Sequence, residues 1–298
     1  MITKNSIKFV CVIGVTSLLF ACGSSEETDD TVSLTDTSVE VKEKDTKAQN
    51  VFYSIPSPIE TTSLLKAAGA KYNKMYLNPI ENVSKYSSVK SKAINLGVYG
   101  SDLSFTSIFD QTQESMLYLR CANKLSAGLG INGAFDDKTT ARLEANLENR
   151  DSLLTIISDS YWNADSYLKD NGQPGVSALI IAGGWMEGLY IATQIANTTN
   201  NTEIIKRIGE QKLSFDNLIA LLDSHKTESE SVAEVLAMLM PLKEAFDSVE
   251  AKSGETTVST DKENGVTTIG NNSSYTMTPE QLKLISQKTA EIRNKMIQ

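Results

Sequence analysis

Apolar residues recur at intervals of three and four along most of the chain, the spacing that gathers them on one face of an α-helix. The repeats are interrupted by turn signals such as Gly128-Leu129-Gly130 and Asn171-Gly172. The pattern predicts an all-α fold, a single multi-helix bundle of about seven to eight helices, with a kink or break at Pro241. The helical stretches are 59–72, 94–109, 116–129, 143–168, 174–195, 204–222, 232–249 and the segment after Thr278.

Three short motifs mark where helices should begin: Ser57-Pro58-Ile59-Glu60, Asn78-Pro79-Ile80-Glu81 and Thr278-Pro279-Glu280-Gln281. Each has a capping side chain, a proline at the first helical position and a Glu or Gln that reaches back. One segment departs from the helical spacing. Thr-rich stretches flank Asn264-Gly265, so we predict a small β-hairpin near 256–269, with a solvated loop as the alternative.

The N-terminal pattern is different. Lys4 and Lys8 precede an apolar run from Phe9 to Phe20, and Ala21 then stands directly before Cys22. About 12 apolar residues are too few to span a bilayer, which needs about 20. The segment resembles the signal peptide and lipobox of bacterial lipoproteins. That resemblance implies that residues 1–21 are cleaved and that Cys22 carries the lipid; an uncleaved membrane anchor is the alternative.

Residues 22–50 are rich in Thr, Ser, Glu and Lys and contain no aromatic residue, so we expect a flexible acidic tether before a helical domain at 51–298. The cluster Glu26-Glu27-Thr28-Asp29-Asp30 resembles the export signal of surface-exposed lipoproteins of Bacteroidota, and Gly23 follows Cys22 where inner-membrane retention uses Asp. The expected location is the cell envelope, lipid-anchored at the outer membrane and exposed on the surface. An ordinary acidic spacer would explain the cluster equally well.

Charge and cysteine content narrow the function classes. The net charge of −9 argues against nucleic-acid binding, which needs clustered Lys and Arg. Loss of Cys11 with the signal and lipidation of Cys22 would leave Cys121 alone, without a disulfide partner, as a buried and inert thiol. The only histidine, His225, lies where a helix should end, and we expect it to be solvated. Nucleophile-elbow, Walker and Cys-x-x-Cys motifs are missing, so no catalytic residue and no cofactor is predicted.

Two glycine-rich helical segments, Leu96–Phe105 and Ala182–Tyr190, are the candidate site. Glycine costs about 1 kcal/mol in a helix interior, so its repeated use needs a reason. Either the helices cross closely, with their carboxylates capped by Arg or backbone groups, or the glycines form the floor of a ligand pocket. In the second case the residues at its rim are Tyr99, Asp102, Trp185 and Glu187.

A metal site would have to draw on carboxylates such as Asp102, Glu187, Glu148 and Asp151. Helical di-iron bundles add Glu-x-x-His pairs, which this chain lacks, and no Asp-rich calcium loop is present, so we predict no metal. Asn149-Arg150-Asp151 is better explained by an internal ion pair or hydrogen bond.

Residues 53–58, 95–103 and 183–190 are similar to segments of helical lipoproteins of Bacteroidota that lack an assigned role. The resemblance implies no catalytic residues. The expected function is a non-enzymatic envelope lipoprotein that contacts the membrane through its lipid and binds a partner protein or small ligand. Two alternatives stay open: an enzyme or metal-binding bundle using Asp102 and Glu187, and a structural or assembly accessory of the outer membrane.

Overall fold

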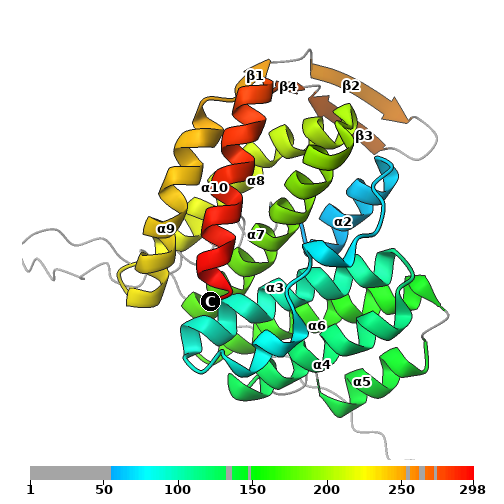
Figure 1. Cartoon of the computed structure of the whole chain (residues 1–298), viewed down its shortest axis with the longest axis vertical. Coiled ribbons are helices and arrows are strands. Elements are labelled where there is room, and N and C mark those ends of the chain that lie inside the picture. Colours follow the sequence, from blue (N-terminus) through cyan, green and yellow to red (C-terminus); the bar gives the residue numbers. More distant parts are fainter. Residues whose placement is uncertain (1–54, 132–135, 147–148, 253–255, 262–265, 272–273) are drawn as a thin grey trace, which may run out of the picture.

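The computed structural model describes residues 55–298 except 132–135, 147–148, 253–255, 262–265 and 272–273 (Figure 1). The described part is a helical bundle, which confirms the predicted all-α class. Two short 3₁₀ helices, Lys74–Tyr76 and Ile80–Ser84, join α2 to α3. The α-helices are α2 (Pro58–Ala67), α3 (Val89–Ile108), α4 (Thr112–Gly128), α5 (Asp137–Glu144), α6 (Arg150–Asp170), α7 (Pro174–Thr199), α8 (Thr202–His225), α9 (Glu230–Asp247) and α10 (Pro279–Met296).

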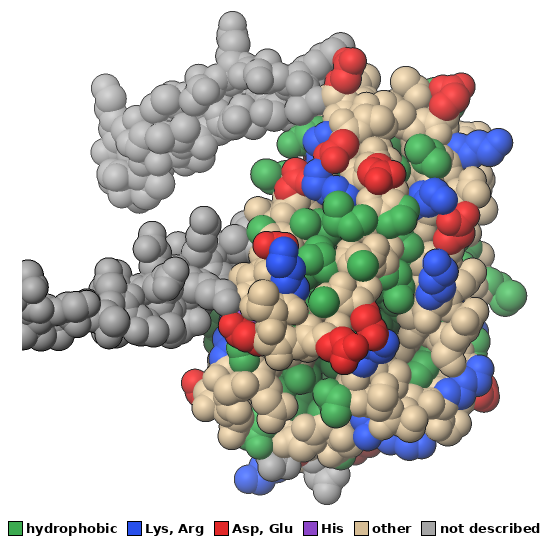
Figure 2. Space-filling view, turned by 90° about the vertical axis from the view of Figure 1, so that its left-hand side faces the viewer, with side chains coloured by type: hydrophobic (Ala, Val, Ile, Leu, Met, Phe, Trp, Pro, Cys, Tyr) green, Lys and Arg blue, Asp and Glu red, His purple; other side chains and the backbone are tan. Residues whose placement is uncertain are grey.

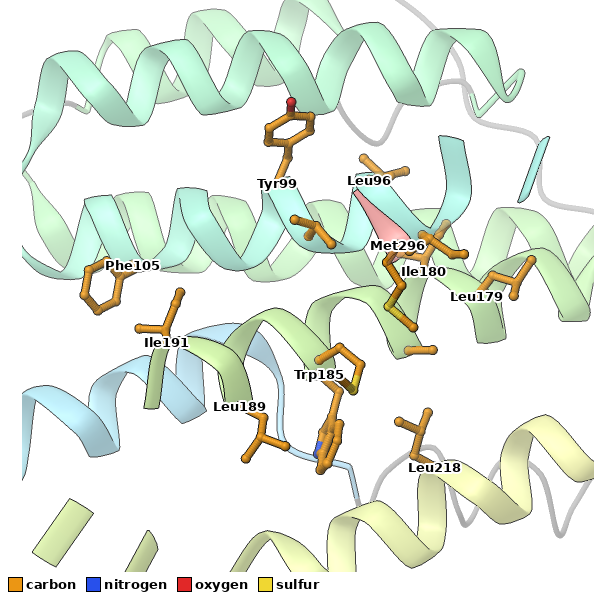
Figure 3. Close-up of a cluster of buried hydrophobic side chains, with 14 of the residues drawn as sticks. Leu96, Tyr99, Phe105, Leu179, Ile180, Trp185, Leu189, Ile191, Leu218 and Met296 are labelled. Atoms are coloured by element: carbon orange, nitrogen blue, oxygen red, sulfur yellow. The ribbon is translucent and has the colours of Figure 1, made fainter. Parts of the chain in front are cut away.

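Helix α7 lies at the centre of the bundle. It packs against α2, α3 and α6 on one side and against α8, α9 and α10 on the other (Figure 1). By length and composition α7 could cross a membrane, but 78% of its most apolar window is buried inside the bundle. Burial on this scale is what the central helix of a packed domain requires. Figure 3 shows part of the buried cluster around these helices: side chains of α3 (Leu96, Tyr99, Phe105), α7 (Leu179, Ile180, Trp185, Leu189, Ile191), α8 (Leu218) and α10 (Met296), with Tyr99 pointing from α3 away from α7.

Two of the three predicted helix starts are confirmed. Ser57 and Thr278 each form a capping box with the Glu or Gln three residues later. The start at Asn78 is wrong, because only a 3₁₀ helix follows and it has no side-chain cap. The Asn78 side chain is buried instead and donates to the Tyr86 hydroxyl at 3.1 Å, so tertiary packing outweighs the local capping signal.

The helix count is slightly higher than predicted because the stretch 143–168 divides. Helix α5 ends at Glu144 and α6 begins at Arg150, where the Asn149 side chain accepts from the Ser152 N–H at 3.0 Å. The break expected at Pro241 does not occur, since α9 continues through it. Pro241 has no N–H to donate to the carbonyl of Ala237, four residues earlier. Both residues lie on the exposed face of α9, so this carbonyl can bind water instead.

The predicted hairpin is present. Strand β2 (Thr256–Asp261) pairs antiparallel with β3 (Val266–Asn271), with Val258 opposite Ile269. The proposed Asn264-Gly265 turn lies outside the described residues. A second antiparallel pair, β1 (Glu250–Lys252) with β4 (Ser274–Thr276), was not predicted. These strands have three residues each, too short for an alternating pattern to stand out.

The outer surface carries charges of both signs. Figure 2 views the side of the molecule on which α9 and α10 lie and shows acidic, basic and apolar side chains interspersed. The exposed large apolar residues of these two helices are Met240 and Leu284. Isolated apolar side chains of this kind are normal on a folded domain, so they indicate no site by themselves.

Candidate functional site

Helices α3 and α7 cross at the glycines that the sequence singles out. A Cβ atom on Gly97 would lie 1.9 Å from the carbonyl oxygen of Ile180, and one on Gly183 would lie 1.9 Å from the carbonyl oxygen of Ile94. No side chain fits at such distances because the obstacle is backbone. Close helix crossing therefore explains both glycines, as the packing interpretation expects.

The Glu187 carboxylate lies inside the bundle and is paired. Arg293 of α10 binds it through two contacts, Nε to Oε2 at 2.8 Å and Nη2 to Oε1 at 2.7 Å. The Glu187 side chain has no exposed surface and that of Arg293 is 7% exposed. The guanidinium also lies 4.5 Å from the centre of the Tyr190 ring. A bidentate buried pair of this kind fixes α10 against α7.

Asp102 of α3 is fully buried near the same pair. Its Oδ2 atom accepts from the backbone N–H of Asn78 at 3.1 Å, and its Oδ1 atom has no hydrogen-bond partner among the described residues. Burial first, and then the charge of Glu187, raise the pKa of Asp102 well above its ordinary value, while Arg293 and the Asn78 N–H oppose the shift. Two carboxylates with one guanidinium favour a protonated Asp102.

Tyr99 and Trp185 are also core residues. The Tyr99 hydroxyl donates to the carbonyl oxygen of Pro79 at 2.9 Å. The Trp185 indole stacks on Phe215, with ring centres 4.7 Å apart, and its N–H donates to the Ser214 hydroxyl at 3.1 Å. All four predicted rim residues are thus buried and engaged inside the bundle.

A pocket of about 560 Å³ does open beside the glycine crossing, between the start of α2 and helices α6 and α7. Gly97 and Gly184 form part of its lining, and Trp185 borders it. The expectation of a pocket rimmed by all four residues needs correction, because Tyr99, Asp102 and Glu187 do not line it. Hydrogen bonds and the Arg293 pair hold those three in the core. The glycines therefore serve both interpretations, as a packing surface and as part of a pocket lining.

The pocket walls are mainly apolar, with carboxylates among them. Apolar lining comes from Ile55, Pro56, Pro58, Ile59, Tyr161, Trp162, Ala164, Ile180 and Ile181. Three acidic residues, Glu60, Asp159 and Asp165, also border it, and no Lys, Arg or His is found among the described lining residues. Sequence reasoning missed this wall, although Asp159, Trp162 and Asp165 share the spacing of one helical face.

The carboxylates considered for a metal do not form a site. Asp102 and Glu187 lie in the core, Asp151 is exposed on the first turn of α6, and Glu148 lies outside the described residues. Within the residues that the structure describes, no group of three or more His, Cys, Asp or Glu is placed to hold a metal ion. At Asn149-Arg150-Asp151, where an internal ion pair or hydrogen bond is expected, Asn149 caps α6 and Asp151 is exposed, and the Arg150 side chain lies outside what the structure describes.

Cys121, the one cysteine among the described residues, and His225 lie apart from this pocket. Cys121 is buried as predicted, and burial raises the pKa of its thiol to about 11, which suppresses the reactive thiolate. His225 does end α8, but its predicted solvation is wrong, because only 7% of the residue is exposed. It shares the buried face of α8 with Leu218, Leu221 and Leu222.

Arg293 is the main residue of this region that the sequence did not reveal. It lies beside Ile292 and Met296 on the buried face of α10. A basic residue among apolar positions of one helical face is the sequence feature that could have indicated a buried ion pair. Comparison of the chain with protein-family models, with curated proteins and with solved structures finds no match.

Proposed function

We propose that the chain is a lipid-anchored envelope lipoprotein whose helical domain binds a small ligand, without catalysis, in the pocket between α2, α6 and α7. The observation that carries the binding proposal is the pocket of about 560 Å³ with Gly97 and Gly184 in its lining. Ligand pockets have volumes of about 300–1,000 Å³ and walls that are mostly apolar. Both properties apply here.

The chemistry of the lining supports binding over catalysis. The described lining includes the hydroxyls of Ser57, Ser158 and Ser177 but neither Cys nor His. Ser57 caps α2 and Ser177 donates to Asp165, so both hydroxyls have structural partners. A serine nucleophile needs a neighbouring base that takes up its proton, most often a histidine, and the described lining contains no histidine; the carboxylate that Ser177 contacts is paired with Lys169. The alternative, an enzyme that uses Asp102 and Glu187, is not supported by the pocket, because neither residue lines it.

The anchor part of the proposal rests on Cys22 and the segment before it. Metabolic labelling with a fatty acid tests it directly in cells that process lipoproteins. The full chain should incorporate the label and a Cys22→Ala variant should not. An unlabelled wild-type chain, or equal labelling of both chains, would contradict the anchor and with it the envelope location.

Binding can be tested separately with phenylbutanol, a neutral apolar probe, by isothermal titration calorimetry. The full chain is held in phosphatidylcholine nanodiscs, with protein-free nanodiscs as the blank. Ile181 lines the pocket and is half-buried, so Ile181→Trp should fill the space and weaken binding about tenfold or more. Ile219 of α8 is equally half-buried but does not line the pocket, so Ile219→Trp is the matched control. Equal loss in both variants, or no binding by the wild type, would reject the pocket.

A further inference from the structure

The acidic wall of the pocket indicates which ligands it accepts. We infer that the ligand is an organic cation, with an apolar body and a protonated amine. This inference rests on the proposed binding function and adds the chemical class of the ligand. The juxtaposition that carries it is one helical face of α6, where Asp159, Trp162 and Asp165 line the same cavity.

Asp165 does not supply the recognition charge, because its carboxylate is already engaged. One oxygen accepts from the Ser177 hydroxyl, and the other pairs with Lys169 at 2.8 Å. Its negative charge is therefore balanced by a lysine on the same helix. These contacts with Ser177 and Lys169 explain how the Asp165 carboxylate can be buried.

Asp159 lies on the same face and is exposed, and it forms no ion pair in the described part of the chain. Glu60, across the pocket, accepts from the Ser57 N–H as part of the α2 capping box and also has no basic partner there. Two carboxylates without a counter-charge thus border a cavity whose described lining contains no basic side chain. Low-dielectric walls concentrate this negative potential within the cavity.

A cation with an apolar body matches both parts of the lining. Its apolar body would contact Ile180 and Ile181, and its ammonium group would approach Asp159 on the wall that also carries the Trp162 indole. Indole rings attract cations through the negative charge on their faces. An anion of the same shape would be repelled by Asp159 and Glu60, and a neutral molecule would gain only the apolar contact.

Three probes of matched shape separate these cases: phenylbutylamine, phenylbutanol and phenylbutyrate, which are cationic, neutral and anionic at pH 7. Their affinities are measured by calorimetry on the full chain in zwitterionic phosphatidylcholine nanodiscs. The amine should bind about three- to tenfold more tightly than the alcohol, and the acid should bind weakest. Higher salt should reduce the preference for the amine.

The variant Asp159→Asn should lower the ratio of amine to alcohol affinity, with Glu60 left as the remaining source of preference. Glu244 of α9 is exposed and outside the pocket lining, so Glu244→Gln removes the same net charge elsewhere and should leave the ratio unchanged. Equal affinities of amine and alcohol for the wild type, or equal effects of both variants, would overturn the inferred ligand class while the pocket still stands. Failure of all three probes to bind would instead reject the proposed function.

Discussion

The pair of Glu187 and Arg293 offers a sharp test of how the core is held together. The change to make is Arg293→Met, which keeps much of the apolar stem and removes the guanidinium. It would leave Glu187 with no exposed surface and no counter-charge, beside a second buried carboxylate at Asp102. Removing one partner of a buried ion pair costs about 3–5 kcal/mol. A domain with about 5–15 kcal/mol of stability would lose a large part of it.

The reverse change, Glu187→Met, should cost less than Arg293→Met. Asp102 lies close enough for the charge of Arg293 to influence it, and it can ionise to balance the guanidinium once Glu187 is absent. The double variant Glu187→Met with Arg293→Met removes both charges together, so its stability should lie within about 1–2 kcal/mol of the wild type. The expected order of destabilisation is therefore Arg293→Met first, then Glu187→Met, with the double variant less affected than the arginine variant.

Urea unfolding at pH 7, followed by far-UV circular dichroism, measures all four proteins in one double-mutant cycle. Two results would refute the reasoning. One is a loss below about 1 kcal/mol for Arg293→Met, which would mean that the Glu187 carboxylate reaches water or another partner. The other is a double variant less stable than Arg293→Met, which would show that the side chains act through packing and not charge.

Three further predictions concern the same region. The fold raises the pKa of Asp102, so the contribution of this carboxyl group to stability is full below the ordinary aspartate pKa and declines as pH rises towards the raised value. The free energy of unfolding of Asp102→Asn, measured in urea, should therefore increase relative to that of the wild type by about 1 kcal/mol or more between pH 4 and pH 8. A difference that does not change with pH would contradict this. Gly97→Ala should destabilise the fold by about 3 kcal/mol in thermal unfolding, because the added Cβ would meet the Ile180 carbonyl oxygen. The control Gly128→Ala should be nearly neutral, because its Cβ would meet only the flexible Lys92 side chain. Equal effects of the two substitutions would exclude the close crossing. The Cys121 thiol should react with a disulfide reagent only after unfolding, and fast reaction of the native chain near pH 8 would show that it is exposed.

The sequence was sufficient where structure depends on neighbours in the chain. The capping boxes at Ser57 and Thr278 involve residues three apart, and the β2–β3 hairpin joins adjacent stretches, so local patterns predicted them. The same logic failed at Asn78, where a buried contact with Tyr86 took the side chain away from its expected cap. Local propensity is a weak guide once tertiary packing competes with it.

The candidate site was only half accessible from sequence. Repeated glycines in α3 and α7 predicted that something approaches their backbones, but the sequence does not show that Gly97 and Gly183 each meet a carbonyl of the other helix. Arg293 meets Glu187 across 106 residues, and no local spacing indicates such a pair. The pocket likewise combines α2, α6 and α7, so its acidic wall became visible only when α6 was placed beside the other two helices.

The Glu187–Arg293 pair also bears on when the domain can close during synthesis. Glu187 must wait for 106 further residues before its counter-charge is made. Two other contacts impose the same order, because Asn95 Nδ2 donates to the Met296 carbonyl oxygen and the Tyr86 hydroxyl donates to the Ile297 carbonyl oxygen. A chain made from its N-terminal end therefore cannot bury Glu187 beside its counter-charge until α10 has been made. The bundle around Glu187 is therefore completed by the last helix of the domain, and shortening the chain before Arg293 would remove the counter-charge as completely as a substitution does.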